Sequence, residues 1–246
     1  MRIIIIGGTS AIAEHCTRLW AERGDLDLTL VGRDESRLER VAADLRVRGA
    51  RCTVRCPVCD FLDPKAIGAT VANIVAAGAP DIVLIAHGQL PAQAECQEDL
   101  VACRDALEIN GVSPALFAEA FATPMQAARH GTLALIGSVA GDRGKRSNYT
   151  YGAAKGLLAR YAEGLQHRFA GSPVKVVLVK PGPTATPMTE ALAARGAKLA
   201  PVAGVAREIV RGIERGKPVV YAPARWRVIM LVIRHLPQWL FGRLDI

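Results

Sequence analysis

Thr132-Leu-Ala-Leu-Ile-Gly-Ser138, followed by Tyr151-Gly-Ala-Ala-Lys155, is the stretch of sequence on which the interpretation of the chain depends. The apolar run predicts a strand that ends at Ser138, and the alanine-rich segment predicts a helix. Residues four apart share one helix face, so Tyr151 and Lys155 should lie side by side. We expect the ammonium to lower the pKa of the Tyr151 phenol below its usual value of about 10. Such a tyrosine can exchange a proton with a substrate oxygen that Ser138 holds.

An isolated Tyr-x-x-x-Lys pattern is more often an ordinary helix tyrosine beside a surface lysine. Tyr149 provides a comparison within this chain, because its i+4 neighbour is Ala153 and not a cation. The functional interpretation of Tyr151 therefore depends on agreement with the rest of the sequence.

The length of 246 residues and a composition that is half hydrophobic and poor in aromatic residues indicate one α/β domain over 1–246. Residues 222–246 form an apolar and basic tail. The N-terminus has one positive charge and four consecutive isoleucines, too few for a signal peptide. We therefore expect a cytoplasmic protein whose first strand is buried.

The six cysteines are expected to be free thiols in a reducing compartment. Cys52, Cys56 and Cys59 are close in sequence, but no fourth Cys or His lies near them to complete a tetrahedral site. We expect no metal.

Apolar strand-like runs alternate with amphipathic helical segments along the whole chain. This order predicts a Rossmann-type doubly wound parallel sheet of about seven strands flanked by helices. The expected strands are 2–6, 26–31, 51–56, 81–85, 132–137, 174–179 and 218–221. The expected helices are 11–23, 35–48, 64–77, roughly 94–128 with a break, 150–170 and 202–215. Ligands of such sheets bind beyond the carboxyl ends of the strands.

The loops after the first two strands fit a dinucleotide. Gly7 allows a tight turn, and Thr9, Ser10 and Ile12 lie where backbone amides can approach a pyrophosphate. A plain strand–helix turn, with Ser10 as N-cap, is the alternative. After the second strand, Arg33 stands where an NAD-preferring protein has an acid, which favours NADP.

Other strand-end residues complete the predicted cofactor site. Asp60 either accepts from an adenine amino group or caps a turn before Pro64, and Gly88 allows close approach of the cofactor beside His87. Asn110 is unfavourable in mid-helix unless its side chain is engaged elsewhere. The segment 180–188 has too many prolines for a helix and is expected to be a shaped loop. Its notable residues are Pro181, Gly182, Thr184 and Thr186.

Taken together, these residues resemble the short-chain dehydrogenase/reductase family along nearly the whole chain. The glycine-rich cofactor motif of the family corresponds to Gly7, Ala11 and Ala13, so two glycines have become alanine. The usual Asn-Ala-Gly after the fourth strand is here Ala86-His87-Gly88.

The resemblance implies a role for each catalytic residue. Tyr151 is the general acid/base, Ser138 positions the carbonyl, and Lys155 tunes the tyrosine and holds the nicotinamide ribose. Asn110 keeps a proton-relay water in place, and 184–186 holds the nicotinamide carboxamide. A small-molecule ketone substrate and a homodimer or tetramer are further expectations.

A narrower resemblance is to reductases of polyprenyl-phosphate-linked 2-keto sugars of cell-wall biosynthesis. It rests on three runs, 85–88, 138–149 and 226–237. It implies an NADPH-dependent ketoreductase that works with a flavin-dependent oxidase. A general carbonyl or 3-oxoacyl reductase and a non-catalytic NADP-binding regulator are the alternatives, and 187–201 does not reveal the substrate.

The basic C-terminal region leaves several partners open. Residues 205–246 hold eight Lys and Arg and three acidic residues, a net charge of +5. The mixture of Trp226, Trp239 and Phe241 with arginines suits peripheral contact with the inner face of a membrane. A lid over the substrate pocket or a subunit interface is the alternative. Nucleic-acid binding is not expected, because the cations form no polar stripe.

Overall fold

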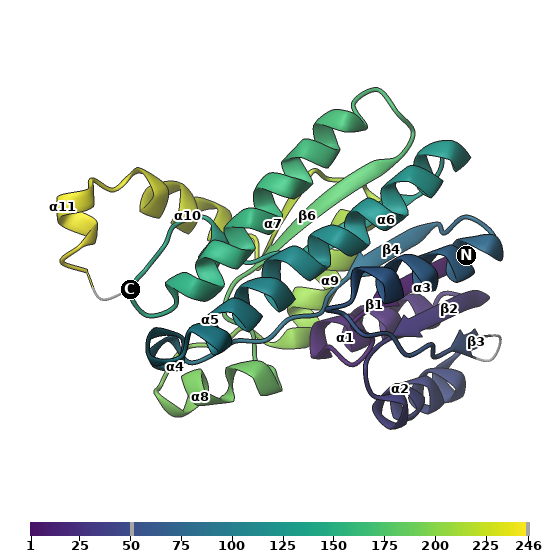
Figure 1. Cartoon of the computed structure of the whole chain (residues 1–246), viewed down its shortest axis with the longest axis horizontal. Coiled ribbons are helices and arrows are strands. Elements are labelled where there is room, and N and C mark those ends of the chain that lie inside the picture. The colour runs from purple at the N-terminus through teal and green to yellow at the C-terminus, as the bar shows by residue number, and fades with distance from the viewer. Residues whose placement is uncertain (50–51, 245–246) are drawn as a thin grey trace.

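The computed structural model, shown in Figure 1, describes residues 1–49 and 52–244 and contains one sheet of seven parallel strands. The strand order is β3-β2-β1-β4-β5-β6-β7, so the chain starts in the middle of the sheet and winds outward in both directions. This confirms the predicted doubly wound fold. The strands are Arg2–Ile6, Leu26–Val31, Cys52–Arg55, Ile82–Ile85, Thr132–Ile136, Lys175–Pro181 and Val219–Ala222.

The inner strand β1 shows that the sheet is buried on both faces. Its four isoleucines are fully buried, and alternate ones enter different cores. Ile3 and Ile5 pack on one side, whereas Ile4 and Ile6 pack on the other. Side chains alternate along a strand, so a continuous apolar run is what a strand covered on both faces requires.

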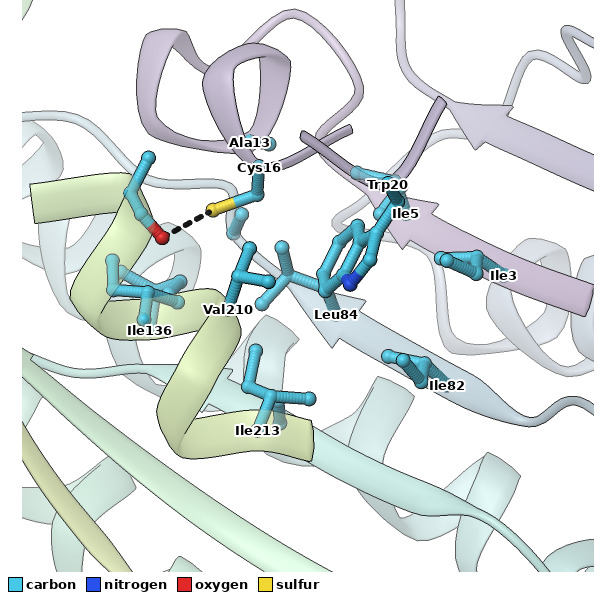
Figure 2. Close-up of a cluster of buried hydrophobic side chains, with 14 of the residues drawn as sticks. Ile3, Ile5, Ala13, Cys16, Trp20, Ile82, Leu84, Ile136, Val210 and Ile213 are labelled. Carbon is cyan, nitrogen blue, oxygen red and sulfur yellow. Dashed lines mark hydrogen bonds between the residues drawn. The ribbon is translucent and has the colours of Figure 1, made fainter. Parts of the chain in front are cut away.

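Helices α1 (Ala11–Ala21), α2 (Glu35–Arg48) and α9 (Val202–Glu214) cover one face of the sheet. Figure 2 shows part of this core, in which Trp20 and Cys16 of α1 meet Val210 and Ile213 of α9. The opposite face carries α3 (Pro64–Ala76), α6 (Ser113–Ala128) and α7 (Tyr149–Arg168).

Two boundaries differ from the sequence-based expectation. The helical region predicted for 94–128 is divided into α4 (Gln93–Glu98), α5 (Leu100–Leu107), a π-helical turn (Glu108–Val112) and α6. Strand β6 runs past 179 to Pro181, which pairs with Ala222, so Lys180 and Pro181 belong to the sheet and not to the following loop. Position 51 of the predicted third strand lies outside the described residues.

The C-terminal tail begins after Ala222, which is the last residue of β7. It folds into α10 (Trp226–His235) and α11 (Gln238–Phe241), separated at Pro237, and Figure 1 shows both projecting beyond the body of the molecule. The loop after β6 contains a short 3-10 turn (Pro187–Thr189) and α8 (Glu190–Ala194). Within the described residues, every helix is too short or too polar to cross a membrane.

Candidate active site

A cavity of about 960 Å³ lies beyond the carboxyl ends of the strands. The loops after β1, β2, β4, β5 and β6 line it, and the tail contributes to its wall. Every residue predicted from the sequence for the cofactor or the chemistry lines this cavity, except Asp60 and Asn110. The fold thus gathers residues from widely separated segments at one place.

Ser138, Tyr151 and Lys155 lie close together in the wall of this cavity. Ser138 follows β5, and its hydroxyl accepts a hydrogen bond from the Ala140 amide at 3.1 Å. The Lys155 ammonium lies 5.8 Å from the centroid of the Tyr151 ring and donates to the Ile136 carbonyl at 3.0 Å. Tyr149, in contrast, is 45% exposed and accepts a hydrogen bond from Gln97 outside the cavity.

The expected lowering of the Tyr151 pKa is wrong for this structure. Burial of the phenol raises its pKa to about 12, although a hydrogen bond with Ser138 opposes the shift. Burial also lowers the pKa of the Lys155 ammonium to about 8. Desolvation disfavours the charged form of both groups, and for the tyrosine it outweighs the hydrogen bond with Ser138. At neutral pH the phenol is therefore a proton donor, and the lysine is a cation.

Asn110 is buried in the π-helical turn and does not line the cavity. Its amide nitrogen donates to the Ala106 carbonyl at 2.8 Å, and its side-chain oxygen accepts from the Gln89 amide at 2.9 Å. A Cβ at Gly88 would lie 2.7 Å from that oxygen. The sequence predicted that the side chain of Asn110 would be engaged elsewhere. In the structure it holds the turn after β4.

The nucleotide end of the cavity is built around Gly7. Its φ of +87° is in the left-handed region, and a Cβ there would lie 2.6 Å from the His87 amide nitrogen. Only glycine fits this close approach of two strand-end loops. Ser10 is the N-cap residue of α1, but its side chain makes no capping hydrogen bond and lines the cavity with Thr9 and Ile12.

His87 is held in a neutral state beside these loops. One ring nitrogen is 2.9 Å from the Ser113 hydroxyl, and the ring packs 4.6 Å from the Phe61 ring, centroid to centroid. Burial, with the nearby cations Lys155 and Arg33, lowers the pKa of His87 to about 3. The side chain therefore adds a neutral wall to the cavity.

The loop after β2 and the first turn of α2 present cations to the cavity. Arg33 and Arg37 both line it, and sequence reasoning had identified only Arg33. Asp34 accepts from the Arg37 amide at 3.0 Å and is the N-cap of α2. Asp60 instead accepts from the Leu62 amide, as a turn aspartate does, and its neighbour Phe61 lines the cavity.

The opposite end of the cavity is apolar and roofed by the tail. Within the described residues, the apolar side chains there come from several segments, namely Leu90, Val139, Pro187, Met188, Leu192, Trp226, Met230, Ile233 and Phe241. A Cβ at Gly182 would overlap the Trp226 indole, so the glycine lets α10 close onto the loop after β6. The tail is thus a lid over this end, one of the arrangements the sequence had left open.

A buried polar network lies beneath the serine loop. The Lys180 ammonium is 2.5 Å from one oxygen of Asp142, and the Tyr221 hydroxyl donates to the other at 2.8 Å. The side chains of the ion pair are 6% and 3% exposed. The network therefore connects the loop that follows Ser138 to strands β6 and β7.

Comparison with known proteins agrees with this architecture. The family model of the short-chain dehydrogenases matches residues 1–196. An uncharacterised oxidoreductase from Streptomyces coelicolor is 34% identical over 98% of this chain and 95% of its own length. Another uncharacterised oxidoreductase, from Mycobacterium tuberculosis, is 31% identical over 98% of this chain and 96% of its own length. A short-chain dehydrogenase from Sphingobium yanoikuyae, solved with NADPH, superposes with a TM-score of 0.83 at 23% identity over 96% of both chains. The chain therefore belongs to the short-chain dehydrogenase family.

Proposed function

We propose that this short-chain dehydrogenase is an NADPH-dependent ketoreductase. The observation that supports the proposal most directly is the meeting of Ser138, Tyr151 and Lys155 in one cavity with the loops after β1 and β2. Positions 7 and 88 accept only glycine, since a Cβ at either would lie within 2.8 Å of neighbouring protein atoms, and both glycines line the cavity. NADPH, when bound, supplies the hydride.

The residues around the ketone each have a separate role in the reduction. Ser138 holds the ketone oxygen by a hydrogen bond. Tyr151 is protonated at neutral pH and donates its proton to that oxygen as the carbonyl carbon is reduced. The Lys155 cation stabilises the tyrosinate left behind and orients the ribose of the cofactor. Asn110 acts indirectly, because its contact with Gln89 sets the turn beside the cofactor.

We propose NADPH over NADH because two guanidinium groups, Arg33 and Arg37, line the cavity after β2. The structure of the Sphingobium yanoikuyae short-chain dehydrogenase contains NADPH, which supports this choice of cofactor. Replacing Arg33→Ser should raise KM for NADPH roughly 10- to 100-fold, the effect of losing a hydrogen bond between charged groups, and leave KM for NADH nearly unchanged.

Steady-state kinetics with both cofactors measures this effect. Arg40→Ser is the matched control, because Arg40 is exposed on α2, the helix that follows Arg33, and does not line the cavity. An equal loss with NADH and NADPH would assign Arg33 to general folding and not to the 2′-phosphate.

The pH dependence of reduction should reflect Lys155. Its pKa of about 8 means that it is charged at pH 7 and neutral at pH 9, whereas Tyr151, with a pKa of about 12, keeps its proton throughout. Hydride transfer should therefore be constant from pH 6 to 7 and fall as pH rises through 8. Single-turnover NADPH oxidation across this range measures it, and a rate that rises above pH 8 would contradict the assignment.

For the substrate, we propose a polyprenyl-phosphate-linked 2-keto sugar. The chain resembles decaprenylphosphoryl-2-keto-erythro-pentose reductase in three runs of sequence, and the apolar roof of the cavity suits a substrate with a long hydrocarbon part. A general carbonyl or 3-oxoacyl reductase is the second candidate, because the same roof also fits an acyl chain.

NADPH oxidation by the purified protein tests this choice. The substrates are a 2-keto polyprenyl-phosphoryl pentose and a 3-oxoacyl thioester of similar apolar length. We expect turnover of the keto sugar at least tenfold above the thioester. Turnover of the thioester alone would replace the substrate proposal, and binding of NADPH without turnover of any ketone would favour a non-catalytic regulator.

We propose two kinds of protein partner, another copy of this chain and a second enzyme. We propose a homodimer or tetramer, as is usual for soluble oligomers, and a flavin-dependent oxidase that forms the ketone. Sedimentation of the purified protein gives its oligomeric state. Coupled oxidation and reduction by the two enzymes, measured through NADPH consumption, tests the oxidase partner.

We also propose that the outer face of the tail meets an anionic membrane surface on the cytoplasmic side. Val228, Leu231, Val232 and Trp239 are 57 to 66% exposed there, and Arg225, Arg227, Arg234 and Arg243 lie among them. Co-sedimentation with phosphatidylglycerol vesicles tests the contact, with phosphatidylcholine vesicles as control. Concentration-dependent dimerisation without vesicle binding would assign this face to a second copy of the chain.

A further inference from the structure

The apolar end of the cavity contains an uneven distribution of charge. Its described lining residues include the cations Arg143 and Lys145, both in the loop between Ser138 and α7. The carboxylates among the described lining residues are Glu14 and Asp34, which belong to the nucleotide end of the cavity, next to β1 and β2. The substrate end thus offers positive charge without an acid to balance it.

Arg143 is already engaged in holding the lid. It donates to the carbonyls of Ile233 and Leu236, at 2.5 and 2.7 Å, and to the side chain of Gln238 at 3.2 Å. Its guanidinium also lies 3.9 Å from the centroid of the Phe241 ring. These contacts fix the end of α10 and the start of α11, so Arg143 has few donors left for a ligand.

Lys145 differs from Arg143 in this respect. It is partly buried at the cavity wall, and within the described residues its side chain makes no hydrogen bond or ion pair, although its backbone carbonyl accepts from the Asn148 amide at 3.1 Å. Its surroundings lower its pKa through burial alone. Desolvating an ammonium group costs free energy that a nearby anion would offset. Among the described residues, this ammonium group therefore has no anionic partner.

We propose that Lys145 binds a phosphate group of the substrate while the apolar part of the substrate lies along the lid. This inference rests on the proposed function, because it deepens the same substrate site. In a lipid-linked keto sugar, a phosphodiester separates the sugar from the hydrocarbon chain. One cavity holds the matching groups, because Ser138 and Tyr151, Lys145, and apolar side chains of α10 and α11 all line it. Because the ammonium group is positively charged, the site should bind a phosphorylated lipid more tightly than a neutral one.

Binding of farnesyl phosphate and of farnesol to the NADP-saturated protein tests the inference by calorimetry. Inorganic phosphate is the third ligand, because it separates an anion site from one that also needs the apolar chain. We expect farnesyl phosphate to bind the wild type at least tenfold more tightly than the Lys145→Gln variant, as for a lost charge-assisted hydrogen bond. Farnesol should bind both proteins equally, and inorganic phosphate should bind far more weakly than farnesyl phosphate.

Lys217→Gln is the matched control, because Lys217 is exposed, precedes the amino end of β7 and does not line the cavity. Equal affinity of farnesyl phosphate for the wild type and Lys145→Gln would overturn the inference, as would an equal loss of farnesol binding. This measurement needs no turnover. If the keto sugar is not reduced but the phosphate effect is present, the proposed ketone fails and the anion site stands.

Discussion

Replacing Tyr151→Phe should lower kcat for ketone reduction by roughly 10²- to 10⁴-fold, the usual range for loss of a positioned general acid. The substitution removes one oxygen from a buried ring and leaves the ring in place. The affinity for NADPH should change by less than about threefold, because the nucleotide loops are separate from the phenol. Rapid-mixing measurement of NADPH oxidation gives kcat, and NADPH fluorescence titration gives the affinity.

Tyr149→Phe provides a control in the same helix. Tyr149 is two residues away, is 45% exposed and contacts Gln97 instead of the cavity. Its substitution should leave kcat within about twofold of the wild type. If Tyr151→Phe kept a tenth or more of the activity, another proton donor would be at work and the assignment of Tyr151 would be wrong.

The sequence predicted the fold well because its signals are local. Continuous apolar runs such as Arg2–Ile6 and alternating helical segments require only neighbouring residues to be recognised, and the order of strands then follows from the rules for crossover connections. The pairing of Tyr151 with Lys155 was predictable for the same reason, since helical geometry alone places them on one face.

The parts that sequence reasoning missed depend on packing between distant segments. The direction of the Tyr151 pKa shift follows from burial by surrounding loops, which spacing does not reveal. In the pair Asp60–Phe61, the turn directs the acid outward and the aromatic ring into the cavity. The amphipathic composition of the tail indicated a lid, a subunit interface or a membrane contact, but not which of its side chains would line the cavity.

The buried network of Lys180, Asp142 and Tyr221 also became visible only in the structure. Its members lie far apart in the sequence, and none belongs to the motif that identifies the family. The network supports the loop that follows Ser138, since Asp142 ends the 3-10 turn that starts after this serine. The stability of this loop therefore depends on a charge pair and not on apolar packing alone.

Replacing Asp142→Ala should destabilise the protein by about 3–5 kcal/mol, the usual cost of leaving one member of a buried ion pair unpaired. This is a large part of the roughly 5–15 kcal/mol that stabilises a typical domain. Lys180 would remain buried without a counter-charge, and the Tyr221 hydroxyl would lose its acceptor. Urea unfolding followed by circular dichroism measures the free energy of unfolding.

Two further variants separate the unpaired charge from a simple loss of contacts. Tyr221→Phe removes one hydrogen bond and leaves the ion pair, so it should cost only about 1 kcal/mol. Asp142→Leu combined with Lys180→Met leaves neither charge, and it should recover most of the stability that Asp142→Ala loses. If this double variant were as unstable as Asp142→Ala, the cost would come from altered packing around the serine loop. The ion pair would then be ruled out as the source of the destabilisation.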